Sequence, residues 1–178
     1  MRALGLVLVW FLCLAASVRA QAPIEAEVKE IDAFNYLCLP CTGPYTGLPA
    51  AVAGFLDRFR RLGIKPIGPL MTVYVNSPLV VKPAELQWEI AYPVSAGQQS
   101  VGELVVKRFA YPRVAQALHK GGYATTYTTI NALYEWITAR GFKTFGGPCV
   151  EFYLDADPAR VPDAEKRTLV AVPVRTSR

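Results

Sequence analysis

Two stretches of the chain space their apolar residues as one face of an amphipathic helix. The first covers residues 48–62, where charged residues lie off the apolar face and Gly63 ends the pattern. The second covers residues 130–140 and ends at Gly141. The apolar positions are Leu48, Val52, Phe55, Phe59 and Leu62 in the first stretch, and Ile130, Leu133, Tyr134 and Ile137 in the second. The pattern predicts one helix in each half of the chain.

Alternating and β-branched residues predict extended segments around each helix. One such segment precedes each helix, and two follow it, joined by a proline-rich loop. The predicted strands cover residues 25–39, 70–75 and 87–92 in the first half, and 103–118, 149–154 and 168–174 in the second. Both halves therefore follow the order strand, helix, strand, strand. We predict an α+β fold with an antiparallel sheet and two main helices.

The two halves also match each other in sequence. A shift of 78 positions pairs Val28-Lys29 with Val106-Lys107, Gly43 with Gly121, Tyr45 with Tyr123, Gly63 with Gly141 and Lys65 with Lys143. Near the ends of the halves the shift is 80 positions, and it pairs Glu85 with Glu165 and Pro93-Val94 with Pro173-Val174. Constant order and spacing indicate an internal repeat. We expect two copies of one unit, about residues 24–95 and 101–175, within one domain over residues 21–178.

The first 20 residues have the pattern of a secretory signal peptide. A basic start is followed by the uncharged apolar run 3–16, and Val18-Arg19-Ala20 fits a cleavage site. A membrane-spanning helix needs about 20 apolar residues, so an uncleaved anchor is the weaker alternative. We expect a periplasmic or secreted protein that begins at Gln21 and has no stable membrane insertion after cleavage.

Composition and charge exclude a nucleic-acid partner. The chain is 52% hydrophobic and only 19% charged. Loss of Arg2 and Arg19 with the signal leaves 17 basic and 14 acidic residues, a net charge of +3. That charge is mild, and no stripe of Lys and Arg alternates with aromatic residues. Because no helix-turn-helix segment fits before residue 24, we do not expect a transcription regulator.

Three cysteines remain after the signal, namely Cys38, Cys41 and Cys149. In an oxidising compartment the simplest expectation is one disulfide and one free thiol, although the sequence does not say which residues pair. Buried thiols are the alternative. The spacing Cys38-Leu-Pro-Cys41 also suggests redox chemistry, but that chemistry needs a helix N-terminus, and here the motif ends a predicted strand. We expect no metal site, because His119 is the only histidine and a structural zinc takes four ligands.

Several segments of the second half together resemble the GyrI-like small-molecule-binding domain. They are His119-Lys120-Gly121-Gly122-Tyr123, Leu133-Tyr134-Glu135-Trp136-Ile137, Gly147-Pro148-Cys149-Val150-Glu151-Phe152-Tyr153-Leu154 with Asp157-Pro158, and Val170-Ala171-Val172-Pro173-Val174. The resemblance covers about residues 24–175, and the block around Glu151 is its most specific part. It implies two strand-helix-strand-strand repeats with a ligand groove between the halves. It also implies that aromatic side chains line the groove and that Glu151 faces a cationic or polar aromatic compound.

The pattern of residues agrees with such a site. Period-two alternation puts Glu151 and Tyr153 on one face of their strand, and the repeat puts Thr72 and Tyr74 at the equivalent positions. The candidate ligand-binding residues are Glu151, Tyr153, Tyr123, Tyr127, Trp88, Tyr74 and Tyr45. Aromatic faces around a carboxylate suit planar cations. The alternative is a solvent-facing or edge position for the acid, with the aromatic residues in the core.

Two classes of function follow. The preferred one is an exported binding protein for a small hydrophobic or cationic aromatic molecule, without a cofactor and possible as a homodimer. The alternative is a hydrolase of reactive electrophiles in which Glu151 directs water, but no nucleophile and base stand at recognisable spacing, so no catalytic residue is assigned. His119 suggests a further alternative, a haem-binding protein, since SOUL-like relatives of the fold bind haem. A lone histidine beside a glycine turn is, however, usually structural.

The signal prediction is tested by the intact mass of the exported protein. Because residues 3–16 are too short to span a bilayer, we expect a soluble fraction whose mass corresponds to a chain starting at Gln21. A membrane-bound fraction that retains Met1 to Ala20 would contradict this prediction.

Overall fold

The computed structural model describes residues 24–155 and 160–176 of the chain. The predicted signal peptide, its cleavage site and the Asp157-Pro158 pair lie outside the described residues. Within the described ranges, no helix is long and apolar enough to cross a bilayer. All the predicted helices and strands of the two halves fall inside these ranges.

The predicted α+β fold is confirmed, with a large antiparallel sheet and two main helices, α1 and α2. The first half contains β1 (Ala26–Glu30), β2 (Phe34–Thr42), α1 (Leu48–Arg61), β3 (Met71–Tyr74) and β4 (Gln87–Val94). The second half contains β5 (Val105–Phe109), β6 (Arg113–Lys120), α2 (Thr126–Ala139), β7 (Phe142–Thr144), β8 (Cys149–Tyr153) and β9 (Arg167–Thr176). A short 3-10 turn precedes each helix, η1 (Tyr45–Gly47) and η3 (Tyr123–Thr125).

The helices end where the sequence predicts, but α2 begins earlier. Gly63 and Gly141 follow the helices with φ of 64° and 74°, in the left-handed region that glycine adopts without steric cost. The start of α2 at Thr126 precedes the predicted start at residue 130 by one turn. Its first turn is rich in threonine and lacks the apolar spacing on which the prediction depended.

Each long extended segment is two strands rather than one. Residues 31–33 separate β1 from β2, and residues 110–112 separate β5 from β6. Neither turn contains glycine, whereas Gly43 and Gly121 mark the ends of the two long segments. The strands also pair across the halves, because β1 lies against β6 and β5 lies against β2. The two halves therefore exchange their first strands.

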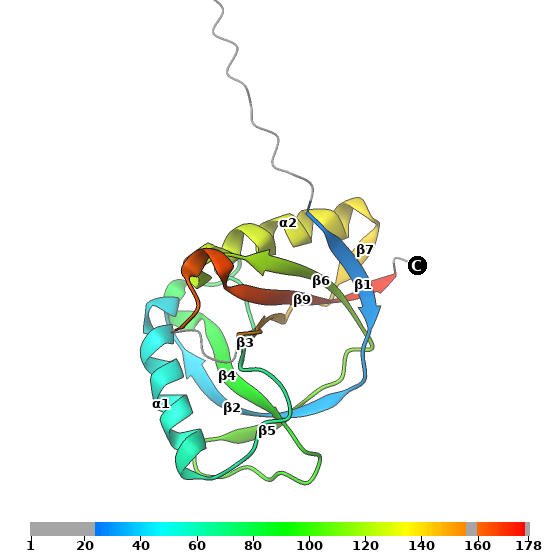
Figure 1. The fold of residues 1–178 in the computed structure, drawn as a ribbon. Coiled ribbons are helices and arrows are strands. Elements are labelled where there is room, and N and C mark those ends of the chain that lie inside the picture. Colours follow the sequence, from blue (N-terminus) through cyan, green and yellow to red (C-terminus); the bar gives the residue numbers. More distant parts are fainter. Residues whose placement is uncertain (1–23, 156–159, 177–178) are drawn as a thin grey trace, which may run out of the picture.

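The sheet is continuous across both halves. The strand order is β1-β6-β9-β8-β3-β4-β2-β5, and β7 pairs with β9. The antiparallel pair of β3 and β8 joins the halves at the middle, with Thr72 opposite Glu151. The sheet is strongly curved, and both helices lie outside the curve, α1 beside β4 and β2 and α2 beside β6 (Figure 1). The helices thus cover one face of the sheet on either side of the central pair, α1 over β4 and α2 over β6 and β9.

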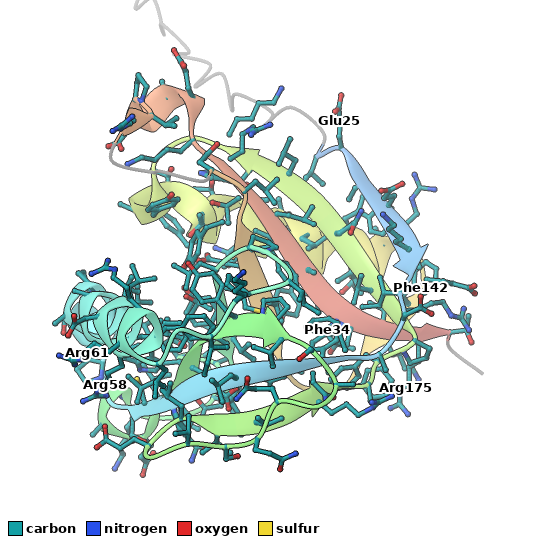
Figure 2. All side chains as sticks on the ribbon, turned by 60° about the horizontal axis from the view of Figure 1, so that its bottom comes forward. Glu25, Phe34, Arg58, Arg61, Phe142 and Arg175 are labelled. Carbon is teal, nitrogen blue, oxygen red and sulfur yellow. The ribbon has the colours of Figure 1, made fainter. Side chains whose placement is uncertain are left out.

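Alternation along the strands divides the core between the two faces of the sheet. On the face away from the helices, Tyr36, Cys38 and Val73 belong to one apolar cluster. Phe34 packs against this cluster inside the curve, while Arg58 and Arg61 lie on the outer side of α1 (Figure 2). On the helix face, one cluster forms under α1 and another under α2; their centres include Phe55, Trp88 and Ile90, and Leu133, Val170 and Val172, respectively.

The expected disulfide is not formed, because all three cysteines are free. Cys38 and Cys41 are three residues apart on β2, so their side chains point to opposite faces of the sheet, and each joins a different apolar cluster. Cys149 belongs to the cluster under α2. Burial raises the pKa of the Cys38 thiol to about 12, with the Glu89 carboxylate as the next cause. The thiols are core side chains, the alternative that the sequence left open.

The strand exchange predicts that neither half folds alone. Residues 101–178 lack β1, β2 and β3, so three strand edges, on β6, β5 and β8, lose their hydrogen-bonded partners. We expect this fragment to be poorly folded or self-associated, whereas residues 24–178 unfold in one cooperative transition. Size-exclusion chromatography and thermal circular dichroism test this. A monomeric fragment with a sharp transition would show that the halves are independent domains.

Candidate functional site

The site is built around Glu151, a buried acid in the middle of the sheet. Glu151 lies on β8 and is 2% exposed. Its register partners are Thr72 on β3 and Val170 on β9, so its side chain is on the helix face, between the clusters under α1 and α2. The alternative of an edge or solvent-facing position is therefore wrong. A buried anion is costly unless nearby groups stabilise it.

Two tyrosines stabilise one oxygen of this carboxylate. Tyr74 from the first half and Tyr153 from the second donate to Glu151 Oε2, at 3.0 Å and 2.9 Å. The Tyr153 hydroxyl is also 2.8 Å from Thr72 Oγ1. Because Tyr153 donates its only proton to the carboxylate, the Thr72 hydroxyl donates to Tyr153. The chain of hydrogen bonds crosses from one half to the other.

Both tyrosines are held in their neutral, donating form. Burial raises the pKa of Tyr74 and of Tyr153 well above the usual value for tyrosine. The negative charge of Glu151 adds to the increase, since a second anion beside it is unfavourable. The two hydroxyls are therefore permanent donors toward Oε2.

The other oxygen of Glu151 has no partner. Oε1 is buried and makes no hydrogen bond to any described residue. None of the ion pairs among the described residues involves Glu151. Buried polar atoms without a partner are rare, and each one points to a missing donor. The carboxylate thus offers a free acceptor at the centre of the molecule.

Two hollows flank the carboxylate. The first hollow, about 730 Å³, lies beside α1, and Leu48, Val52 and Leu56 of that helix form its wall opposite Tyr123 and Tyr153. The second hollow, about 350 Å³, lies beside α2, and Ile130 and Tyr134 face Tyr45 and Tyr74. Glu151 lines neither hollow. The rings of Tyr153 and Tyr74, one on each side, separate it from them.

The aromatic walls of the two hollows have the same construction. Tyr45 packs edge-on against Tyr74 with ring centroids 5.1 Å apart, and Tyr123 packs against Tyr153 at 5.0 Å. In each pair, one ring comes from the turn before a helix and the other from a central strand. The Tyr123 hydroxyl is buried without a partner. The first hollow therefore combines an apolar helix wall with a second unpaired polar atom.

The structure brings six of the seven predicted site residues to this region. Tyr153 and Tyr123 line the first hollow, Tyr74, Tyr45 and Tyr127 line the second, and Glu151 lies between them. Trp88 is the exception, because it is 3% exposed and its indole N–H donates to the Gly43 carbonyl at 3.0 Å. Trp88 on β4 pairs with Tyr74 on β3, and the Tyr45 ring packs edge-on against the Trp88 indole. Trp88 is thus a core side chain beside Tyr45 and lines neither hollow.

Sequence reasoning missed Tyr92, Asp155 and Tyr134 as wall residues. Tyr92 and Asp155 line the first hollow, and Tyr134 lines the second. In the sequence, Tyr134 belongs to the apolar face of the second predicted helix. The repeat carries a signal for a wall position, since Tyr134 on α2 corresponds by the shift of 78 to Leu56, which lines the first hollow.

His119 has a structural environment. Its Nδ1 lies 2.8 Å from Thr129 Oγ1 and its Nε2 lies 3.1 Å from Thr125 Oγ1, so both ring nitrogens have hydroxyl partners. The side chain is buried between β6 and the start of α2. An iron ligand needs a free ring nitrogen, and this arrangement offers none. The described residues contain no group of three or more His, Cys, Asp or Glu side chains placed to hold a metal ion.

The two hollows and Glu151 between them are called the groove below. The fold and this groove define a small-molecule-binding domain. The family model of the GyrI-like small molecule binding domain matches residues 24–175. The chain belongs to this family. No curated relative matches the chain.

Solved structures share the fold at low sequence identity. The EcmrR protein in its complex with DNA has a TM-score of 0.75 and 16% identity, covering 87% of this chain and 59% of that one. SAV2435 bound to tetraphenylphosphonium has a TM-score of 0.60 and 13% identity, covering 85% and 94% of the two chains. A hydrolase from Listeria innocua has a TM-score of 0.61 and 14% identity, covering 86% and 94%.

The hydrogen-bond chain predicts unequal effects of removing the two tyrosine hydroxyls. Tyr74→Phe removes one donor to Glu151, whereas Tyr153→Phe also leaves Thr72 without its acceptor. We expect Tyr74→Phe to lower the free energy of unfolding by about 1–3 kcal/mol and Tyr153→Phe to lower it further, as buried groups lose their partners. Urea unfolding measures both, with Tyr127→Phe, at a ring that is 60% exposed, as the matched control. Equal stability of Tyr153→Phe and the control would contradict this assignment.

Proposed function

We propose that the chain is an exported small-molecule-binding protein whose groove holds a hydrophobic or cationic aromatic ligand. The observation that carries this proposal is the buried Oε1 of Glu151, which has no partner among the described residues. The aromatic and aliphatic walls of the two hollows supply the apolar contact area. A positive group of the ligand would provide the missing partner of Oε1.

The charge of the site favours a cation. Glu151 forms no ion pair with a described residue, and its two donors are neutral hydroxyls. A carboxylate anion in a region of low effective dielectric attracts a cation more strongly than it does in water. The flanking tyrosine rings add cation–π attraction for the same ligands. Family membership and a tetraphenylphosphonium-bound neighbour support the same class of ligand.

Access to Glu151 requires a tyrosine to move. Because Tyr74 and Tyr153 stand between the carboxylate and the two hollows, a ligand reaches Oε1 only when one of these rings turns aside. The other tyrosine can keep its hydrogen bond to Oε2 during that motion. The ligand thus gains the free oxygen without leaving the carboxylate wholly unpaired. The first hollow is the better entrance for a bulky ligand because it is the larger, about 730 Å³ against about 350 Å³.

The hydrolase alternative has support only from its fold neighbours in Listeria innocua, at 14% identity. Cys149 is a thiol two residues before Glu151 on β8, so the two side chains share one face of the sheet. Burial, followed by the charge of Glu151, raises the pKa of this thiol far above its usual value, so it stays protonated. Incubation with electrophilic aromatic compounds separates the two functions. Turnover would favour a hydrolase, and saturable quenching of tyrosine and tryptophan fluorescence without turnover would favour the binding protein.

Glu151→Gln tests the role of the charge directly, because it keeps the shape of the side chain. We expect the variant to bind tetraphenylphosphonium more weakly by about 1–3 kcal/mol, the scale of a charged hydrogen bond. The neutral triphenylphosphine oxide should lose much less affinity. The melting temperature should be unchanged or raised, since a buried charge without a cationic partner is removed.

The control for this experiment is Glu135→Gln on the exposed side of α2, which changes the net charge equally outside the groove. Calorimetric titration of both ligands into all three proteins gives the comparison. Equal cation affinity in wild type and Glu151→Gln would show that Glu151 does not face the ligand. Stronger cation binding in the variant would show that the ligand groove has been assigned to the wrong face of the sheet.

A further inference from the structure

The second hollow is lined by four tyrosines and by no charged side chain. The tyrosines are Tyr45, Tyr74, Tyr127 and Tyr134, and no Lys, Arg, Asp or Glu of the described residues lines this hollow. Rings gathered around a cavity attract a quaternary ammonium ion, because the face of each ring is electron-rich. A volume of about 350 Å³ lies within the range of small-molecule sites. The hollow therefore suits a small cation.

Glu151 supplies the negative charge for this hollow. Tyr74 lines the hollow and donates to Glu151 Oε2 at 3.0 Å, so the carboxylate lies at the end of this side chain. Burial raises the pKa of Tyr45, and the charge of Glu151 is among the further causes. The carboxylate thus acts on two wall residues of the hollow. The other buried acid, Glu89 on β4, does not serve this hollow, because it lies on the face away from the helices and pairs with Lys107.

The first hollow occupies the equivalent position beside α1. Val52 on its helix wall corresponds by the shift of 78 to Ile130, which lines the second hollow. The first hollow is about 730 Å³, against about 350 Å³ for the second, and its helix wall is aliphatic. The repeat thus places two hollows of unequal size on either side of Glu151. The larger one suits a bulky cation such as tetraphenylphosphonium.

One carboxylate serves both hollows. Oε1 of Glu151 has no partner among the described residues, and Tyr74 and Tyr153 donate to Oε2. A cation that reaches Oε1 from the second hollow turns Tyr74 aside and leaves Tyr153 as the donor. A cation from the first hollow does the reverse. Two cations at once would remove both donors and bring two positive charges to one acid, so the second cation binds more weakly than the first.

We propose that the second hollow is a separate binding site for a small quaternary ammonium ion, and that the two hollows exclude each other because they share Glu151. The inference rests on the proposed function, since it takes Glu151 as the acceptor for a cation. The first hollow holds a bulky aromatic cation, and the second holds a small one. Occupancy of either hollow lowers the affinity of the other, and this coupling is reciprocal. The protein thus holds one cation of either class at a time.

The test is calorimetric titration of choline and tetraphenylphosphonium into the protein, alone and together. We expect saturable binding of choline with a Kd below about 1 mM, and binding of its neutral isostere 3,3-dimethylbutan-1-ol weaker by about tenfold or more. Saturating choline should weaken tetraphenylphosphonium by about tenfold or more, and saturating tetraphenylphosphonium should weaken choline by the same factor. This mutual effect should disappear in Glu151→Gln, which removes the shared charge, and persist in Glu135→Gln.

Variants of the walls distinguish two hollows from one shared site. Ile130→Trp fills the second hollow, and Val52→Trp, at the equivalent position of α1, fills the first. Ile130→Trp should abolish choline binding and retain tetraphenylphosphonium binding, and Val52→Trp should do the reverse. Because a larger side chain can disturb packing, Tyr127→Ala, at a ring that is 60% exposed, is an independent test. It should weaken choline by about tenfold or more without affecting tetraphenylphosphonium, whereas Tyr127→Phe keeps the ring and should restore choline binding.

Several results would overturn the inference. Absence of saturable choline binding would do so, as would simultaneous binding of both cations with unchanged affinities. Weakening of both ligands in Tyr127→Ala would show one shared site instead of two. Mutual weakening that persists in Glu151→Gln would show that the competition does not pass through the carboxylate. The proposed function fails by a different result, namely equal affinity of wild type and Glu151→Gln for tetraphenylphosphonium alone, so the two failures can be told apart.

Discussion

The burial of one carboxylate, Glu151, is the constraint on which the rest of the structure depends. A buried anion needs donors, and the two that reach it, Tyr74 and Tyr153, come from different halves of the chain. The antiparallel pairing of β3 and β8 brings them together and places Thr72 within reach of Tyr153. The site therefore exists only when the sheet is continuous across both halves. The groove therefore forms only when the whole sheet forms.

The two buried acids of the sheet are stabilised in different ways, and this determines what each can attract. Glu151 accepts hydrogen bonds from two neutral hydroxyls and forms no ion pair with a described residue. Glu89 is paired with Lys107, so the local charge is already balanced before any ligand arrives. Both retain one unpartnered oxygen. The acid on the helix face thus has only neutral partners, whereas the acid on the other face is paired with an ammonium group.

Sequence patterns predicted the parts of this molecule that depend on local periodicity. Alternation on β8 correctly placed Glu151 and Tyr153 on one face, and glycines marked the helix ends. Alternation also puts Trp88 on that face, but it does not say which residues on a face are covered, and Tyr45 covers this one. An oxidising compartment favoured one disulfide among the three thiols, yet Cys38 and Cys41 point to opposite faces. The pairing of Glu89 with Lys107 has no signal in the local sequence pattern, because Lys107 lies on a strand that joins the first half only by exchange.

The exchanged strands also determine how the molecule responds to mechanical load. The described chain enters the fold through β1, which is hydrogen-bonded to β6 of the second half and to no other strand. Tension on the segment before β1 is therefore transmitted first to the half of the protein that is more distant in sequence. That tension acts on one outer ladder, while β8 and β3, which hold the groove, lie three and four strands further into the sheet. A tether at the N-terminal side would load the edge of the fold and leave its binding centre under little stress.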